Sequence, residues 1–145
     1  YPTTLDSYLK ASDLKAFEYI NEDIPVDAKF MINIYRFNFS DTLMVGSDGG
    51  YWIPLLTGRE TVVPPMVFNN ERVSDPIFVE NLRILGKLNG DLTSPESLEM
   101  LRNEGITHVY IGERGGPINP ADLLSSPYFK LVYENNPIYI FKYNQ

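Results

Sequence analysis

The chain has 145 residues, a formal net charge of −7 and a pI near 4.6, with 43% apolar and 21% charged residues. These values are typical of a folded globular protein, and we expect one domain that spans residues 1–145. The acidic balance excludes nucleic acid as a partner, because phosphate binding needs clustered Lys and Arg. The absence of cysteine excludes disulfides, thiolate chemistry and zinc–cysteine sites.

Residues 1–10 show no steady hydrophobic period, and we interpret them as a lead-in from an upstream, transmembrane segment. Ser12 is the expected N-cap of a helix over 13–22, which Pro25 ends. The predicted apolar stripe of this helix consists of Leu14, Ala16, Phe17 and Ile20.

The nearly continuous apolar run 29–35 predicts a buried strand, in which Asn33 is the one unusual residue. The central segment 43–59 runs from apolar residues through a turn with three glycines to an aromatic stretch and Gly58-Arg59. This order predicts an extended segment, a tight turn and a short helix, with the Asp48 side chain as a cap. One interpretation is structural: the capped turn delivers aromatic and aliphatic side chains into the core, namely Tyr51, Trp52 and Leu55.

The second half of the chain alternates helices and strands. We predict, in order, a strand at 60–63, a helix from 75 to about 89, a helix that starts at Ser94-Pro95 and ends at Gly105, a strand at 106–111, a helical turn at 119–124, and a hairpin of 128–133 with 138–143. The predicted fold is an α/β three-layer sandwich, with a mostly parallel sheet of about five strands and a C-terminal antiparallel hairpin.

Motifs for cofactor chemistry are missing. The glycines of the central turn do not have G-x-G-x-x-G spacing, and no P-loop or G-x-S-x-G elbow occurs. His108 is the only histidine, and without cysteine or a second histidine it cannot form a zinc site. We therefore expect no cofactor and no metal, and interpret His108 as a buried histidine with one hydrogen bond in preference to a catalytic base.

Two carboxylates are candidates for a ligand site. Asp48 and Glu113 each follow an apolar segment, so both are expected at the carboxyl edge of the sheet, where α/β proteins bind ligands. Arg59 is a candidate partner of either, and the flat rings of Tyr51 and Trp52 suit a sugar. An alternative makes Arg59 and Asp48 a structural ion pair that holds the loop.

Several segments together resemble the extracytoplasmic domains that follow the membrane helices of bacterial multi-pass, GT-C-like glycosyltransferases and related membrane proteins. The resemblance covers most of the chain and lies in residues 16–21, 24–30, 48–54, 57–59, 105–111, 131–134 and 138–141. In such enzymes the catalytic acid lies between membrane helices. The resemblance therefore implies an accessory domain that is not itself an enzyme.

The implied role is to cover the membrane active site or to position an acceptor, outside the cytoplasm and tethered to the membrane. The implied partners are the protein's own transmembrane region and a glycan or lipid-linked sugar. Two alternatives stay open. One is a stand-alone sugar or small-ligand binding module, and the other is a soluble enzyme with a site built from Asp48, His108 and Glu113.

Overall fold

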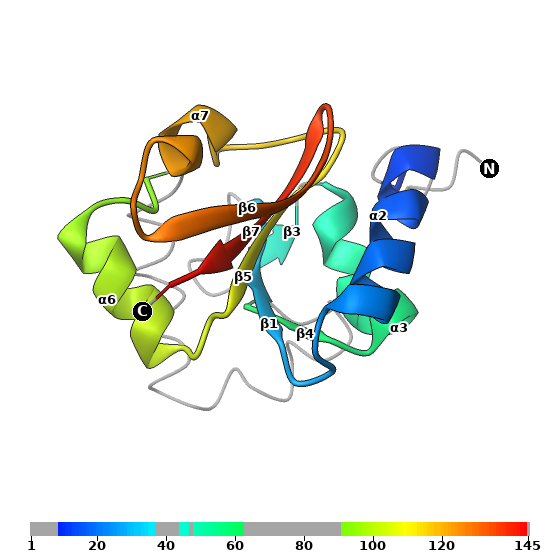
Figure 1. Cartoon of the computed structure of the whole chain (residues 1–145), viewed down its shortest axis with the longest axis horizontal. Coiled ribbons are helices and arrows are strands. Elements are labelled where there is room, and N and C mark those ends of the chain that lie inside the picture. The colour runs from blue at the N-terminus through cyan, green and yellow to red at the C-terminus, as the bar shows by residue number, and fades with distance from the viewer. Residues whose placement is uncertain (1–8, 37–43, 47, 63–90, 145) are drawn as a thin grey trace.

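The computed structural model describes residues 9–36, 44–46, 48–62 and 91–144 (Figure 1). The predicted helix at 75–89 and most of the lead-in lie outside these residues. The elements are α2 (Ala11–Asp23), β1 (Lys29–Met31), β2 (Ile34–Arg36), β3 (Met44–Gly46), η1 (Gly49–Trp52), α3 (Ile53–Thr57), β4 (Glu60–Thr61), α6 (Pro95–Asn103), β5 (His108–Ile111), α7 (Pro120–Leu124), β6 (Phe129–Asn135) and β7 (Ile138–Tyr143). No helix within the described ranges has the length and apolar character that a bilayer crossing requires.

A five-stranded mixed sheet with the order β4-β1-β5-β7-β6 forms the centre of the molecule. Strand β1 pairs in parallel with β4 and β5, whereas β7 is antiparallel to both β5 and β6. The predicted α/β class and the C-terminal hairpin are confirmed, and the sheet is mixed because that hairpin belongs to it. Figure 1 shows α2 and α3 on the right of the sheet and α6 and α7 on its left.

The strand predicted at 29–35 is two separate strands. Strand β1 ends at Met31, and Ile34–Arg36 pairs instead with β3 in a two-stranded antiparallel ribbon. The break falls at Asn33, which is fully buried and hydrogen-bonded through both ends of its amide. A buried amide needs such partners, so the chain leaves the sheet where they are available.

Helix α2 differs from its prediction at its N-terminus. Its N-cap is Lys10 rather than Ser12, and the Asp13 carboxylate accepts the Lys10 backbone N–H at 2.9 Å. Leu14 is 49% exposed, so its predicted place on the buried stripe was wrong. The buried face instead consists of Asp13, Ala16, Phe17 and Ile20.

The predicted helix starts at Ser94-Pro95 and Asn119-Pro120 are confirmed. The Ser94 hydroxyl accepts the Ser97 N–H at 3.2 Å at the start of α6, and the Asn119 side chain accepts the Ala121 N–H at 3.0 Å at the start of α7. Gly105, which follows α6, has the φ of +71° that glycine adopts without strain. These signals depend on neighbouring residues only, so a sequence can reveal them.

Candidate functional site

The carboxyl ends of β1 and β5 form the natural ligand-binding edge of this sheet. The two strands are adjacent and parallel, and the chain continues from β1 to β4 on one side and from β5 to β6, beyond β7, on the other. Open α/β sheets bind ligands at such a topological switch point. Here η1 and the first turn of α2 meet the residues that follow both strands.

Asp48 is the centre of this edge. Its side chain is fully buried and accepts three hydrogen bonds, from the Asn33 amide at 2.8 Å, the Gly50 N–H at 2.9 Å and the Gly112 N–H at 2.8 Å. It is the N-cap of η1, which confirms its predicted capping role. Burial raises the pKa of the Asp48 carboxyl to about 6, against the opposing effect of the three donors.

Asn33 connects three segments at the same edge. Its Nδ2 donates to Asp48, and its Oδ1 accepts the Ile118 N–H at 2.8 Å. The amide therefore ties the end of β1 both to η1 and to the loop after β5. Sequence reasoning noted Asn33 as unusual in an apolar run but gave it no role.

Asp13 is a second buried carboxylate that sequence reasoning missed. It is fully buried, and its Oδ1 accepts the hydroxyl of Tyr110 at 2.5 Å. Burial raises the pKa of Asp13, and the nearby Glu113 charge adds to the rise. The pKa of Tyr110 is also raised, first by burial and then by the Asp13 charge. A carboxylate in the first turn of a helix usually faces solvent, so its sequence position gave no signal.

The two buried carboxylates approach the same point on the backbone. A Cβ atom placed on Gly112 would lie 2.9 Å from the Asp48 Cγ and 3.0 Å from the Asp13 Oδ1. The two groups are therefore at most about 6 Å apart, a separation at which like charges raise each other's pKa. Neither has an ion-pair partner among the described residues.

Glu113 lies at the same edge as Asp48, as the sequence predicted. It directly follows Gly112, and its exposed carboxylate accepts the Ser12 hydroxyl at 2.9 Å. Ser12 therefore joins the start of α2 to the loop after β5 instead of capping its helix.

Arg59 does not pair with Asp48, so the predicted ion pair was wrong. Its guanidinium donates to the Thr57 carbonyl at 2.6 Å, the Ile24 carbonyl at 2.7 Å and the Asn21 side-chain oxygen at 3.1 Å. The side chain is 9% exposed and ties the end of α3 to the end of α2. This position serves structure, because the cation has no open side toward a ligand.

Tyr51 and Trp52 are partly exposed and contact each other edge to face, with ring centroids 5.4 Å apart. The indole Nε1 of Trp52 is buried without a hydrogen-bond partner. Leu55, which we expected in the core, is 55% exposed, and Ile53 is buried in its place. The turn thus delivers Ile53 into the core and packs the partly buried Trp52 against it, as predicted for Trp52, whereas Tyr51 stays partly exposed.

His108 lies at the opposite end of β5 from this edge. It is 7% exposed, and its Nδ1 is 2.8 Å from the Thr107 hydroxyl, as expected for a buried histidine with one hydrogen bond. Burial, with Lys142 nearby, lowers its pKa to about 4. Four strand residues at about 3.3 Å each place it about 13 Å from Gly112. The site proposed from Asp48, His108 and Glu113 is therefore not assembled.

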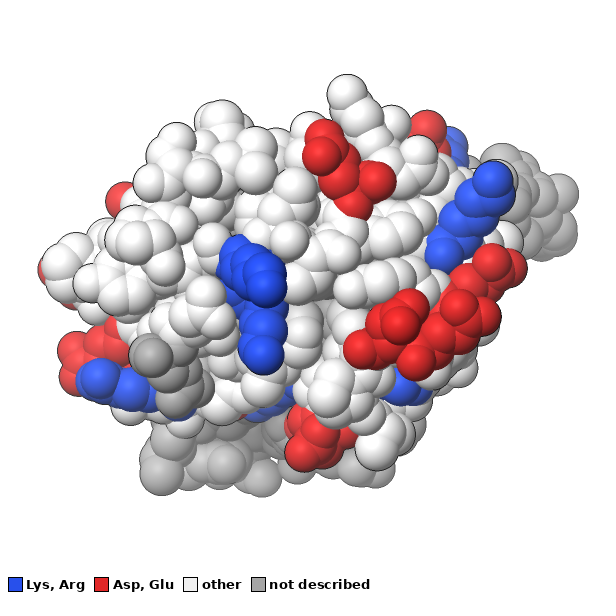
Figure 2. All heavy atoms as spheres, viewed as in Figure 1, with Lys and Arg blue, Asp and Glu red and all other residues white. Residues whose placement is uncertain are grey.

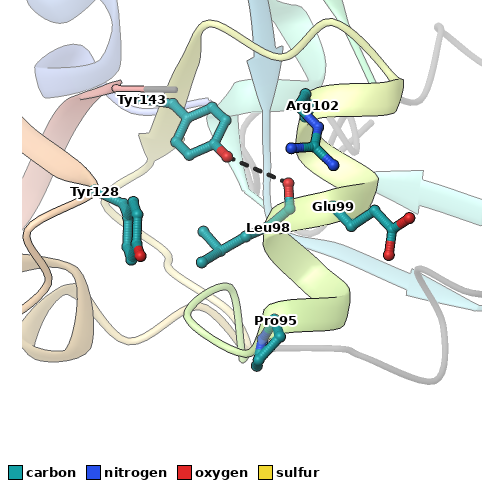
Figure 3. Close-up of a pocket in the computed structure, with 6 residues that line it drawn as sticks. All are labelled: Pro95, Leu98, Glu99, Arg102, Tyr128 and Tyr143. Carbon is teal, nitrogen blue, oxygen red and sulfur yellow. Dashed lines mark hydrogen bonds between the residues drawn. The ribbon is translucent and has the colours of Figure 1, made fainter.

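A separate groove lies between α6 and the C-terminal hairpin, with a volume of about 330 Å³. Its lining residues are Pro95, Leu98, Glu99, Arg102, Tyr128 and Tyr143. In Figure 3 the Leu98 side chain points toward the two tyrosines, and the Tyr143 hydroxyl donates to the Leu98 carbonyl at 3.2 Å. None of the site residues predicted from the sequence lines this groove.

The charges of the described surface are mixed. On the face in Figure 2, acidic and basic side chains are interspersed. No group of three or more His, Asp or Glu side chains in the described ranges has the arrangement of a metal site. Asp13 and Asp48 have no exposed surface, so they hold segments together but cannot contact a substrate in this structure.

Comparisons of the chain with protein-family profiles, with curated proteins and with solved structures find no match.

Proposed function

We propose that the chain is a non-catalytic, extracytoplasmic accessory domain of a membrane-embedded, glycosyltransferase-like protein, where it covers the membrane active site or positions an acceptor. One observation carries the non-catalytic part: the polar residues best suited to chemistry are occupied. Asp48 and Arg59 are buried among protein partners, and His108 lies at the other end of β5. Neither Asp48 nor Arg59 presents an open polar group to a substrate, and His108 is too far from the switch point to act with them.

We also propose that the fold is a three-layer sandwich, with helices on both faces of the sheet. Its support is the placement of α2 and α3 on one side of the sheet and of α6 and α7 on the other in Figure 1. Such a body presents α3 outward, and the exposed Leu55 and Leu56 give that helix an apolar surface. We assign this surface to contact with the protein's own transmembrane region.

The test has a genetic and a biochemical arm. The native reading frame upstream of Tyr1 is expected to encode several hydrophobic spans, and protease added outside the membrane is expected to cleave this domain in intact cells. Membranes with the full-length protein should transfer sugar, and deletion of the domain should reduce that transfer. An upstream sequence without spans, or glycosyl transfer by the isolated chain, would overturn the proposal.

A second candidate function is a small-ligand binding module. Two places favour it: the partly exposed Tyr51–Trp52 pair, whose indole N–H is buried without a partner, and the groove beside the 48% exposed Tyr128. Trp52 is the only tryptophan, so its fluorescence reports on the first place directly. A panel of neutral and acidic glycans should change that fluorescence, and Tyr128→Ala tests the groove through loss of binding in calorimetry. Silence in both measurements would reject this candidate.

A further inference from the structure

The strongest feature outside the proposed function is the pair of buried carboxylates at the switch point. Asp13 comes from the first turn of α2, and Asp48 caps η1. A Cβ atom on Gly49 would lie 2.5 Å from the Asp13 Cγ, so the η1 backbone packs directly against this carboxylate. The two acids therefore hold α2 and η1 over the carboxyl ends of β1 and β5.

We propose that Asp13 and Asp48 form a proton-dependent latch, which is closed when the pair retains a proton and opens at this edge when both carboxylates are ionised. Opening would move η1, with Tyr51 and Trp52, away from the switch point. The latch would thus control access to the edge where α/β sheets bind ligands. It goes beyond the proposed function and does not depend on it.

The groups around the two carboxylates explain why ionisation, and not protonation, opens the latch. From α2 the pair meets the Lys10 backbone N–H, from β5 the Tyr110 hydroxyl, and from the following loop the Gly112 N–H and the Glu113 carboxylate. Tyr133 of β6 also raises the pKa of Tyr110 electrostatically. The charges that act on the two carboxylates are those of Glu113 on Asp13 and of Asp13 on Asp48, and both are acidic.

Neutral donors stabilise each carboxylate, but a second negative charge within about 6 Å opposes its ionisation. A buried charge without a cationic partner is costly. Loss of the last proton therefore favours a state in which at least one carboxylate reaches water. Titration belongs to the pair rather than to either residue.

The first measurement is a side-chain carboxyl titration by carbon-13 NMR. Burial raises the pKa of Asp48 from 3.8 to about 6, so its resonance should titrate well above the ordinary Asp range. Asp13→Asn removes the neighbouring charge and should lower the Asp48 midpoint. Glu18→Gln, which removes an exposed charge from the same helix, should leave the midpoint unchanged. Midpoints near 3.8 for both acids would overturn the latch.

The second measurement follows opening itself. The Gly50 and Gly112 amides donate to Asp48, so their hydrogen-exchange protection factors should fall between pH 5 and pH 7.5. The Tyr143 amide serves as the reference, because it donates to the Thr107 carbonyl at 2.8 Å at the opposite end of β5 from the latch. In Asp48→Asn the protection of both glycine amides should no longer depend on pH. If the two amides follow Tyr143 at every pH in the wild-type protein, the latch does not open and the proposal fails.

Discussion

Gly112 is the residue at which both buried carboxylates pack against the backbone. Its φ lies outside the left-handed region, so a side chain here meets a steric obstacle and no backbone strain. In Gly112→Ala the new methyl group would press on Asp48, Asp13 and the Gly49 N–H, each within 3.0 Å. We expect a loss of about 1–3 kcal/mol in unfolding free energy, measured by urea denaturation.

Gly105→Ala is the matched control for this prediction. A Cβ atom there meets nothing within 4 Å, but φ is +71°, so the cost is the conformational one of about 1 kcal/mol. If Gly112→Ala costs less than Gly105→Ala, the two carboxylates are not packed against the backbone as described.

Asn33 pairs with two buried groups through its amide. Asn33→Ala would remove one of the three donors to Asp48 and the acceptor of the Ile118 N–H. The unpaired Ile118 N–H costs about 1–3 kcal/mol and the lost donor to Asp48 about 1 kcal/mol, so we expect a loss of roughly 2–4 kcal/mol by urea denaturation. The same change should raise the pKa of Asp48 further, because the Asn33 donor lowers it. Asn103→Ala, at an exposed position of α6, should change stability by less than about 0.5 kcal/mol.

For single residues, the sequence predicted the roles that depend on neighbours in the chain and missed the roles that depend on contacts with distant segments. The Asp48 cap needs only the next turn, and it was predicted. The partners of Asn33 and Asp13 lie far along the chain, at Ile118 and Tyr110. Asn33 still left a trace, as a polar residue in an apolar run, whereas Asp13 resembled an ordinary first-turn acid.

Arg59 connects two elements, α2 and α3, and its planar fork suits three acceptors at once. In Arg59→Lys the ammonium would satisfy only part of this set from a different geometry. We expect a loss of about 1–3 kcal/mol, measured as a lower urea midpoint with an unchanged m-value. Arg102→Lys, at an exposed position of α6, is the control and should be nearly neutral. Equal effects of the two changes would contradict the assigned role of Arg59.

Element starts and ends were predictable to the extent that they are local. Ser94-Pro95, Gly105 and Asn119-Pro120 carry their cap chemistry in sequence, and the structure confirms them. Strand β1 was predicted too long, because apolar residues continue past the point where Asn33 leaves the sheet. Hydrophobic periodicity reports burial, and a segment can be buried without continuing its strand.

For the whole molecule, the α/β class and the closing hairpin follow from the alternation of helices and strands. The order β4-β1-β5-β7-β6 does not, because it depends on which strands meet across the fold. The candidate site follows that order: only the adjacency of β1 and β5 brings Asn33, Asp48 and Gly112 together. The sequence therefore predicted that Asp48 and Glu113 lie at this edge, but it did not predict that Asp13 is buried beside Asp48.

Buried groups of two kinds have opposite effects on the pH dependence of global stability: the Asp48 and Asp13 carboxyls, whose pKa values are raised, and the His108 imidazole, whose pKa is lowered. The pKa of Asp48 is raised from 3.8 to about 6, so between these pH values the folded state holds more protons than the unfolded chain, and stability falls as pH rises. The pKa of His108 is lowered from 6.5 to about 4, so the folded state holds fewer protons there, and stability rises with pH. Each effect is about 3 kcal/mol over the window from pH 4 to pH 6.5.

Because the effects of Asp48 and His108 oppose each other, single substitutions should reveal them. Urea denaturation of His108→Gln is expected to show stability that falls by up to about 3 kcal/mol from pH 4 to pH 6.5, relative to the wild-type curve. Asp48→Asn is expected to show the reverse, a rise of similar size relative to the same curve. The double variant should return to the wild-type slope, because the groups lie near opposite ends of β5 and contribute independently. Two single variants whose slopes change in the same direction would contradict this balance.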